Sequence, residues 1–209
     1  MARVDFYFDF LSPYSYLATF RIARLEQDFA AQVVWHAINL ESAKAAIGNT
    51  RQPAHQIPQK LAYVKTDLAR WAERYGATLH FPDDPGFFDS ARTVRLNRAF
   101  VWAAQRNAGA PFARATFASL WDGSSAPDTT GDTIIASATT AAGLPPADCI
   151  GGANLSETVA AWERENRDAQ TRGVFGVPTF LVDDQPFWGN DRFDFLEEYL
   201  RDPTRAVRL

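Results

Sequence analysis

The segment with the clearest capacity for chemistry is FDFLSPYS, residues 8–15, in which an alternating stretch ends at the pair Ser12-Pro13. A serine directly before a proline is typical of a helix N-terminus, where unpaired backbone N–H groups and the helix dipole favour an anion, including a thiolate. There the Ser12 hydroxyl can donate a hydrogen bond to a bound sulfur and keep it ionised, whereas a free thiol with a pKa of about 8.5 is mostly protonated at neutral pH. The same serine can serve as a plain helix cap worth about 1 kcal/mol, so both interpretations stay open.

A second segment, GVFGVPT at residues 173–179, is a loop whose proline opens an apolar stretch. A proline at the start of a strand needs no functional explanation. A cis bond between Val177 and Pro178 would instead leave the N–H and C=O groups of Val177 free to pair with an extended, peptide-like ligand, as an added strand does. The segment is therefore either a structural strand start or a binding edge.

The third segment, FWGNDR at residues 187–192, precedes the last helical stretch. Asn190 and Asp191 are residue types that cap helices. At a helix N-terminus, Asp191 can also bind the ammonium group of a ligand while backbone N–H groups bind its carboxylate. Capping and ligand binding are both compatible with this segment.

Hydrophobic periodicity predicts the scaffold that positions these segments. Residues 4–10 alternate between apolar and polar side chains, and residues 31–36 are short, apolar and β-branched, so both stretches indicate strands. Between them a helix is expected to begin near Pro13 and to pack one face on the sheet, through Tyr14, Ala18, Ile22, Leu25 and Phe29. Together these elements predict a β-α-β unit with parallel strands.

The middle of the chain is expected to be helical, since amphipathic periodicity covers residues 61–75, 90–107, 111–121, 132–142 and 156–170. After it, TFLV (179–182) and QPFW (185–188) around Asp183-Asp184 predict a hairpin, followed by a helix over residues 191–200. This order predicts an α/β protein with a thioredoxin-like fold and an inserted all-helical subdomain. Residues 1–38 and 171–209 would form the thioredoxin-like domain and residues 39–170 the inserted helical domain.

Composition excludes several classes of partner. Over 209 residues the formal net charge is -4, and lysine and arginine are scattered, which argues against nucleic acid or an anionic membrane as the main partner. No apolar run approaches the roughly 20 residues that span a bilayer, and the N-terminus has no apolar leader, so the protein is expected in the cytoplasm. The histidines, His36, His55 and His80, do not lie at ligand spacing, so no metal is expected. A small molecule is the expected partner.

Taken together, FDFLSPYSYLA (8–18), VFGVPTF (174–180) and WGNDR (188–192) resemble the 2-hydroxychromene-2-carboxylate isomerase family. That family is related to the kappa-class glutathione transferases and, more distantly, to the DsbA-type oxidoreductases. AIGN at residues 46–49 and a pattern over residues 58–72 extend the likeness along nearly the whole chain. The resemblance implies a thioredoxin-like fold of the DsbA and kappa-class type.

The resemblance also implies glutathione as cofactor and assigns roles at the sulfur. Ser12 would hydrogen-bond the glutathione sulfur, at the position where a disulfide oxidoreductase has the first cysteine of its Cys-x-x-Cys motif. Ser15 replaces the second cysteine, and Cys149 is the only cysteine in the chain, so the protein is not expected to cycle a disulfide. Lys44 matches the family's lysine near the substrate carboxylate.

Further assignments by resemblance concern the peptide part of glutathione. Val177, next to a cis Pro178, would pair with the cysteinyl backbone. The other end of the tripeptide would be held by Trp188, Gly189, Asn190 and Asp191.

The implied activity is the glutathione-dependent isomerisation of a small aromatic keto acid, of the type that converts 2-hydroxychromene-2-carboxylate to trans-o-hydroxybenzylidenepyruvate. Glutathione thiolate would add to the conjugated carbon, the former double bond would rotate, and elimination would return the thiol, so glutathione acts as a cofactor and is not consumed. The resemblance further implies a homodimer.

The chain departs from the family pattern on the substrate side. Pro53 and Ala54 stand where members that process naphthalene intermediates carry a Ser-Asn pair, and an expected tyrosine is missing from PGFFD at residues 85–89. His55 could supply a polar contact, although a solvated loop histidine is expected. Two alternatives therefore stay open: a kappa-class-like glutathione transferase acting on another electrophile, and a non-catalytic glutathione-binding module.

Overall fold

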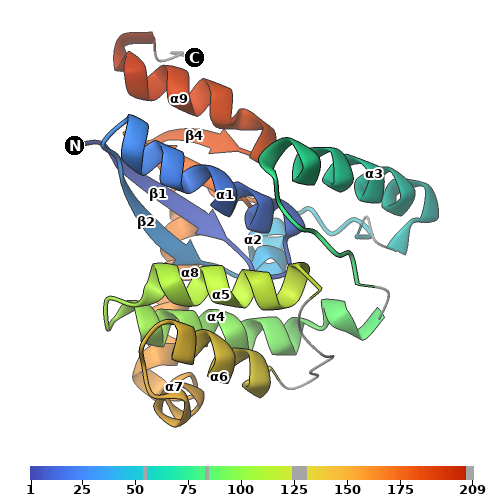
Figure 1. Cartoon of the computed structure of the whole chain (residues 1–209), viewed down its shortest axis with the longest axis vertical. Coiled ribbons are helices and arrows are strands. Elements are labelled where there is room, and N and C mark those ends of the chain that lie inside the picture. Colours follow the sequence, from blue (N-terminus) through green and yellow to red (C-terminus); the bar gives the residue numbers. More distant parts are fainter. Residues whose placement is uncertain (54–55, 83–84, 124–130, 206–209) are drawn as a thin grey trace.

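In the described part of the chain, four strands form one mixed sheet that contains the predicted β-α-β unit and hairpin. The computed structural model describes residues 1–53, 56–82, 85–123 and 131–205. Strand β1 (Arg3–Phe8) pairs in parallel with β2 (Gln32–Ala37), and helix α1 (Pro13–Asp28) connects them. Strands β3 (Thr179–Val182) and β4 (Gln185–Trp188) form an antiparallel hairpin, and the sheet order is β2-β1-β3-β4 (Figure 1). The predicted hairpin bounds are confirmed.

Between β2 and β3 every described regular element is a helix. These elements are α2 (Leu40–Ala46), α3 (Pro58–Tyr75), the 3-10 turn η2 (Pro85–Phe88), α4 (Ser90–Ala104), α5 (Gly109–Trp121), α6 (Asp132–Ala141), α7 (Pro146–Gly152) and α8 (Ser156–Thr171). Figure 1 shows α4 to α7 gathered at one end of the molecule and α9 (Phe193–Arg201) at the other. The thioredoxin-like fold with a helical insertion is thus confirmed, whereas the domain bounds at residues 38 and 171 stay a prediction.

Several boundaries differ from the sequence-based expectation. Strand β1 ends at Phe8, two residues early, because the chain turns at Asp9, whose side chain accepts a hydrogen bond from the backbone N–H of Leu11 at 2.9 Å. The last helix does not start at Asp191: a 3-10 turn, η3 (Asn190–Arg192), precedes α9. Helix α7 was not predicted, since its prolines and two glycines are typical of loops.

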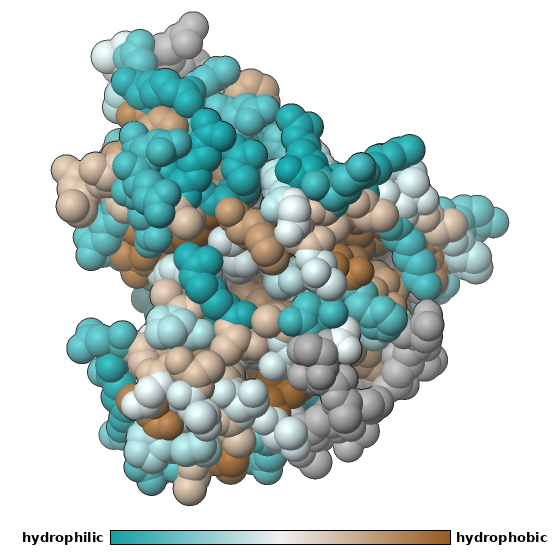
Figure 2. Space-filling view, viewed as in Figure 1, coloured by the Kyte–Doolittle hydropathy of each residue, from teal (hydrophilic) through white to brown (hydrophobic). Residues whose placement is uncertain are grey.

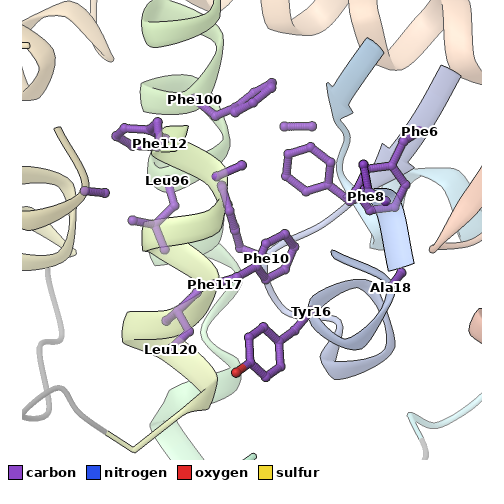
Figure 3. Packing of buried hydrophobic residues seen from close by; sticks show 14 of the residues in the cluster. Phe6, Phe8, Phe10, Tyr16, Ala18, Leu96, Phe100, Phe112, Phe117 and Leu120 are labelled. Atoms are coloured by element: carbon purple, nitrogen blue, oxygen red, sulfur yellow. The ribbon is translucent and has the colours of Figure 1, made fainter. Parts of the chain in front are cut away.

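The inner face of β1 carries the aromatic core that joins the sheet to the helical block. The alternation of the strand directs Phe6 and Phe8 to one side, where both are fully buried. Phe8 contacts Phe100 of α4 with ring centroids 5.0 Å apart, and Phe10 contacts Phe117 of α5 at 4.8 Å (Figure 3). The indole of Trp121 donates to the carbonyl of Phe10 at 2.9 Å. The turn that leads to Ser12 is therefore anchored in the core.

The outer face of β1 carries a partly buried network of charged side chains. The Asp5 carboxylate contacts the ring of His36 at 3.0 Å and the guanidinium of Arg172 at 2.8 Å, and His36 also bonds Glu165. Burial alone would lower the pKa of His36, but its hydrogen bonds to Asp5 and Glu165 raise that pKa above the ordinary value. The network fixes the end of α8, from which the loop of residues 173–178 departs.

The surface is mixed in character. In the view of Figure 2, hydrophilic residues dominate the part over α1 and α9, while hydrophobic residues appear mostly across the middle of the molecule. Within the described ranges, no helix is long and apolar enough to cross a bilayer.

The two adjacent glycines of α7 provide a test of the core packing. A Cβ on Gly152 would overlap the indole of the buried Trp102, whereas a Cβ on Gly151 would meet open space. We expect Gly152→Ala to lower the free energy of unfolding by about 1–3 kcal/mol through overpacking. Gly151→Ala should raise it by about 0.5–1 kcal/mol, because alanine loses less entropy in a helix. Urea unfolding measures both, and equal effects at the two positions would contradict this packing.

Candidate active site

Ser12 caps α1 and also faces a cavity. Its Oγ accepts a hydrogen bond from the backbone N–H of Ser15 at 3.1 Å, so the capping interpretation is confirmed. Ser12 is 5% exposed and lines a cavity of about 540 Å³. Because the serine oxygen acts as acceptor toward the helix, its own proton is left to donate to a ligand. Capping and binding are therefore compatible roles of the same hydroxyl.

Two adjoining cavities are lined by all the residues that the sequence analysis assigned to glutathione or to the substrate. The larger, of about 540 Å³, is lined by Ser12 and Lys44 among others. The smaller, of about 340 Å³, is lined by Pro178, Gly189, Asn190 and Asp191. Tyr14, Val177 and Trp188 line both cavities. Segments from the two ends of the chain and from α2 thus form one continuous site.

The boundary between the cavities is the edge formed by Val177. The Val177-Pro178 bond is cis. Neighbouring backbone groups are paired: the carbonyl of Pro178 accepts from Gly189 N–H at 2.9 Å, and that of Gly176 accepts from the Thr179 hydroxyl at 2.7 Å. Within the described part of the chain, the N–H and C=O groups of Val177 have no hydrogen-bond partner. They are available to an extended ligand, as an open strand edge would be.

The smaller cavity is acidic and contains unsatisfied polar groups. Asp67 and Asp191 both line it, and the hydroxyl of Tyr14 donates to Asp67 at 2.8 Å. Burial and the bond to Asp67 raise the pKa of Tyr14 well above its ordinary value, so the phenol stays protonated. Asn190 is 3% exposed, and neither polar atom of its side chain has a partner among the described residues. Buried amides are normally paired, so Asn190 is suited to bind a polar ligand.

The larger cavity is mainly apolar with a single positive charge. Among the described residues that line it, Lys44 of α2 is the only cation, and no ion pair of Lys44 appears in that part of the chain. Its apolar walls come from several elements, including Leu11, Leu40, Ile47, Leu61, Val64, Phe81, Phe88 and Phe175. Such a cavity suits an aromatic ring that carries a carboxylate.

The departures from the family pattern lie partly in this wall. Pro53 lines the larger cavity, whereas Ala54 and His55 lie outside the described residues. Phe88, from the segment without the expected tyrosine, also lines the cavity. The segment from which the resemblance led us to expect a tyrosine thus contributes an apolar ring to the wall.

Comparison with known proteins assigns the chain to a family. The model of the DSBA-like thioredoxin domain matches residues 3–201. The 2-hydroxychromene-2-carboxylate isomerase of Pseudomonas putida is 35% identical, with 93% of this chain and 92% of that protein aligned. The enzyme of the same name from Sphingobium xenophagum is 32% identical over 95% of this chain and 98% of its own. This chain belongs to the 2-hydroxychromene-2-carboxylate isomerase family.

Solved structures agree with membership of the isomerase family. One 2-hydroxychromene-2-carboxylate isomerase superposes with a TM-score of 0.84 at 33% identity, covering 97% of this chain and 96% of the other. A DsbA-type oxidoreductase from Streptomyces coelicolor shares the fold at 18% identity, with a TM-score of 0.76 over 100% of this chain and 93% of its own. In this member of the isomerase family, the segment from Ser12 to Ser15 contains no cysteine, and Cys149, the single cysteine of the sequence, is buried in α7, where burial raises its pKa.

Tyr14 and Asp67 are the site residues that sequence reasoning missed. Both lie within stretches that resemble the isomerase family, but 53 positions separate them, and no local pattern indicates that they are hydrogen-bonded. The spacing of Asp67 on α3 identifies it only as a half-exposed helix residue. Their contact depends on how α1 and α3 pack.

Proposed function

We propose that this protein is a glutathione-dependent isomerase that acts on 2-hydroxychromene-2-carboxylate or a related aromatic keto acid. The observation that carries the proposal is the arrangement of one donor hydroxyl, one open backbone edge and one cation around adjoining cavities, contributed by Ser12, Val177 and Lys44. Three relatives at 32–35% identity are named 2-hydroxychromene-2-carboxylate isomerase, and each aligns with this chain over most of its length. This similarity supports the same type of reaction.

The residues present fit glutathione, a tripeptide with a thiol, an ammonium group and two carboxylates. Asp67 and Asp191 give the smaller cavity the charge that an ammonium group requires. The unpaired amide of Asn190 and the free backbone groups of Val177 supply polar partners for the peptide. Ser12, at the N-terminus of α1, would donate to the sulfur.

When bound, glutathione supplies a thiolate that adds reversibly to a conjugated carbon of the substrate and so permits rotation about the former double bond. Ser12 and the positive end of the α1 dipole favour negative charge at the sulfur. Lys44 would hold the substrate carboxylate, and the apolar walls of the larger cavity would orient the ring and exclude water. The chain therefore contributes charge stabilisation and orientation.

A transferase is distinguished from the isomerase by what happens to the thiol, whereas a binding module would bind glutathione and turn over neither this electrophile nor the chromene. The protein is mixed with glutathione and 1-chloro-2,4-dinitrobenzene, and free thiol is counted over time; glutathione affinity is measured separately by calorimetry. We expect glutathione to bind and the thiol to persist. Rapid consumption of thiol would indicate a transferase, and the absence of glutathione binding would reject the proposal.

We also propose that the protein acts in the cytoplasm as a homodimer, as the family resemblance implies. Light scattering at micromolar concentration tests the oligomeric state. A mass equal to that of one chain would overturn the dimer.

A further inference from the structure

A buried carboxylate, that of Asp9, bonds two residues that line the larger cavity without lining the cavity itself. Asp9 follows β1 and is 3% exposed. Its Oδ1 accepts the backbone N–H of Leu11 at 2.9 Å, and its Oδ2 accepts the backbone N–H of Leu40 at 2.8 Å. One side chain thus joins its own turn to Leu40, which lies 31 positions further along the chain.

Both held residues belong to functional segments. Leu11 directly precedes Ser12, whose own N–H donates to the Asp9 carbonyl at 3.0 Å. Leu40 is the first residue of α2, the helix that carries Lys44. Leu11 and Leu40 both line the larger cavity. Asp9 is therefore bonded both to the turn that carries Ser12 and to the helix that carries Lys44.

We propose that Asp9 is a positioning residue that holds the Ser12 turn against the Lys44 helix, so that the sulfur and the substrate carboxylate meet in one cavity. The geometry of this inference rests on the two hydrogen bonds of Asp9. Its expected effect on the reaction rate rests on the proposed function. Ionised Asp9 accepts through both oxygens, whereas the protonated form presents an O–H to one of the two backbone donors and loses that bond.

The surroundings of Asp9 make its ionisation sensitive to mild acid. Burial raises the pKa of Asp9 to about 6, against the opposing effect of the N–H groups of Leu40 and Leu11 and the amide of Asn97. The negative charge of Glu41 in α2 raises the pKa of Asp9 further. The residues of α4 that lie beside Asp9 are uncharged: Ser90, Thr93, Val94 and Asn97. The catalytic cavity should therefore loosen below a pH of about 6.

The first test compares Asp9→Asn with Glu197→Gln, which alters an equally buried carboxylate in α9 that lines neither cavity. For Asp9→Asn we expect kcat/KM for 2-hydroxychromene-2-carboxylate to fall about 100-fold, as misplacement of reacting groups by about 1 Å does. Glutathione affinity should be nearly unchanged, since the smaller cavity does not contact Asp9. The fall of kcat/KM at acid pH that the wild type shows should disappear in Asp9→Asn. The pKa of the bound thiol, read from the thiolate absorbance, should be unchanged. Glu197→Gln should retain the wild-type profile.

A second pair of variants tests the hydrogen bond from Leu40 to Asp9 without changing the carboxylate. Leu40 is the first helical residue of α2, where proline is favoured, and Asn39 before it is extended, as a residue before proline prefers. Leu40→Pro therefore deletes the N–H that Asp9 accepts, while Leu40→Ala deletes only the side chain. We expect Leu40→Pro to reproduce the kinetic loss of Asp9→Asn and Leu40→Ala to lose less.

A readout that is independent of turnover separates this inference from the proposed function. If the wild type does not convert the chromene, binding of 1-naphthoate to the glutathione-loaded protein and amide exchange at Leu11 and Leu40 are measured instead. Weaker naphthoate binding and faster exchange in Asp9→Asn would support the positioning role. It would be overturned by unchanged kinetics and naphthoate binding in Asp9→Asn, or by a parallel loss of glutathione affinity, which would indicate general loosening.

Discussion

Ser12→Ala is expected to lower kcat/KM for the glutathione-dependent reaction by about 100- to 1,000-fold, the usual cost of removing one donor to a stabilised anion. The alanine cannot donate to the sulfur, so the pKa of the bound thiol should rise and the thiolate absorbance at neutral pH should fall. The loss of the cap to Ser15 N–H should cost only about 1 kcal/mol of stability. A pH titration of the glutathione-bound protein, followed by the ultraviolet absorbance of the thiolate, measures the pKa of the bound thiol.

Ser15→Ala is the matched control for this variant. Ser15 is buried in the same helix turn, and its hydroxyl has no partner among the described residues. Its backbone N–H, which donates to Ser12 Oγ, is retained in alanine. Activity and thiol pKa should stay close to the wild type. An unchanged thiol pKa in Ser12→Ala, or an equal loss in both variants, would show that Ser12 does not stabilise the thiolate.

Lys44→Met is expected to lower kcat/KM for the carboxylate substrate by about 10- to 100-fold, which corresponds to a lost hydrogen bond between charged groups. Lys44 is the only cation among the described residues of the larger cavity, so no neighbour there can replace it. The loss should appear mainly in KM, glutathione affinity should be retained, and Lys44→Arg should restore part of the activity. Steady-state kinetics over a range of substrate concentrations separates the effect on KM from the effect on kcat.

Two controls decide whether the lysine acts through its charge. Lys60→Met changes an exposed lysine of α3 that lines neither cavity, and it should have no effect. The methyl ester of the substrate, which lacks the carboxylate charge, should react equally with the wild type and Lys44→Met. A loss that is the same for the acid and the ester would assign Lys44 a structural role instead.

The scaffold of the site follows from local sequence patterns. Alternating side chains in β1, and two short apolar runs separated by Asp183-Asp184, are sufficient to predict the strands, and Ser12-Pro13 marks the start of α1. These signals depend on neighbouring residues only, because backbone preference and hydrophobic periodicity are local properties. The three chemically suggestive segments could therefore be placed at the ends of strands and helices before the structure was known.

The polar contacts that shape the cavities could not be predicted in that way. The bonds from Tyr14 to Asp67 and from Leu40 to Asp9 join residues 53 and 31 positions apart. They depend on the packing of α3 and α2 against the β-α-β unit, which periodicity does not specify. The burial of Asp9 likewise has no local signal, since alternation alone makes it the polar end of a strand.

The most direct test of the central claim is the conversion of 2-hydroxychromene-2-carboxylate, followed by its ultraviolet spectrum, with and without a catalytic amount of glutathione. We expect many turnovers for each glutathione molecule added, little turnover without it, and no loss of free thiol at the end. Turnover that is equally fast without glutathione, or a thiol consumed in proportion to product, would contradict the assignment of glutathione as the cofactor of this isomerase.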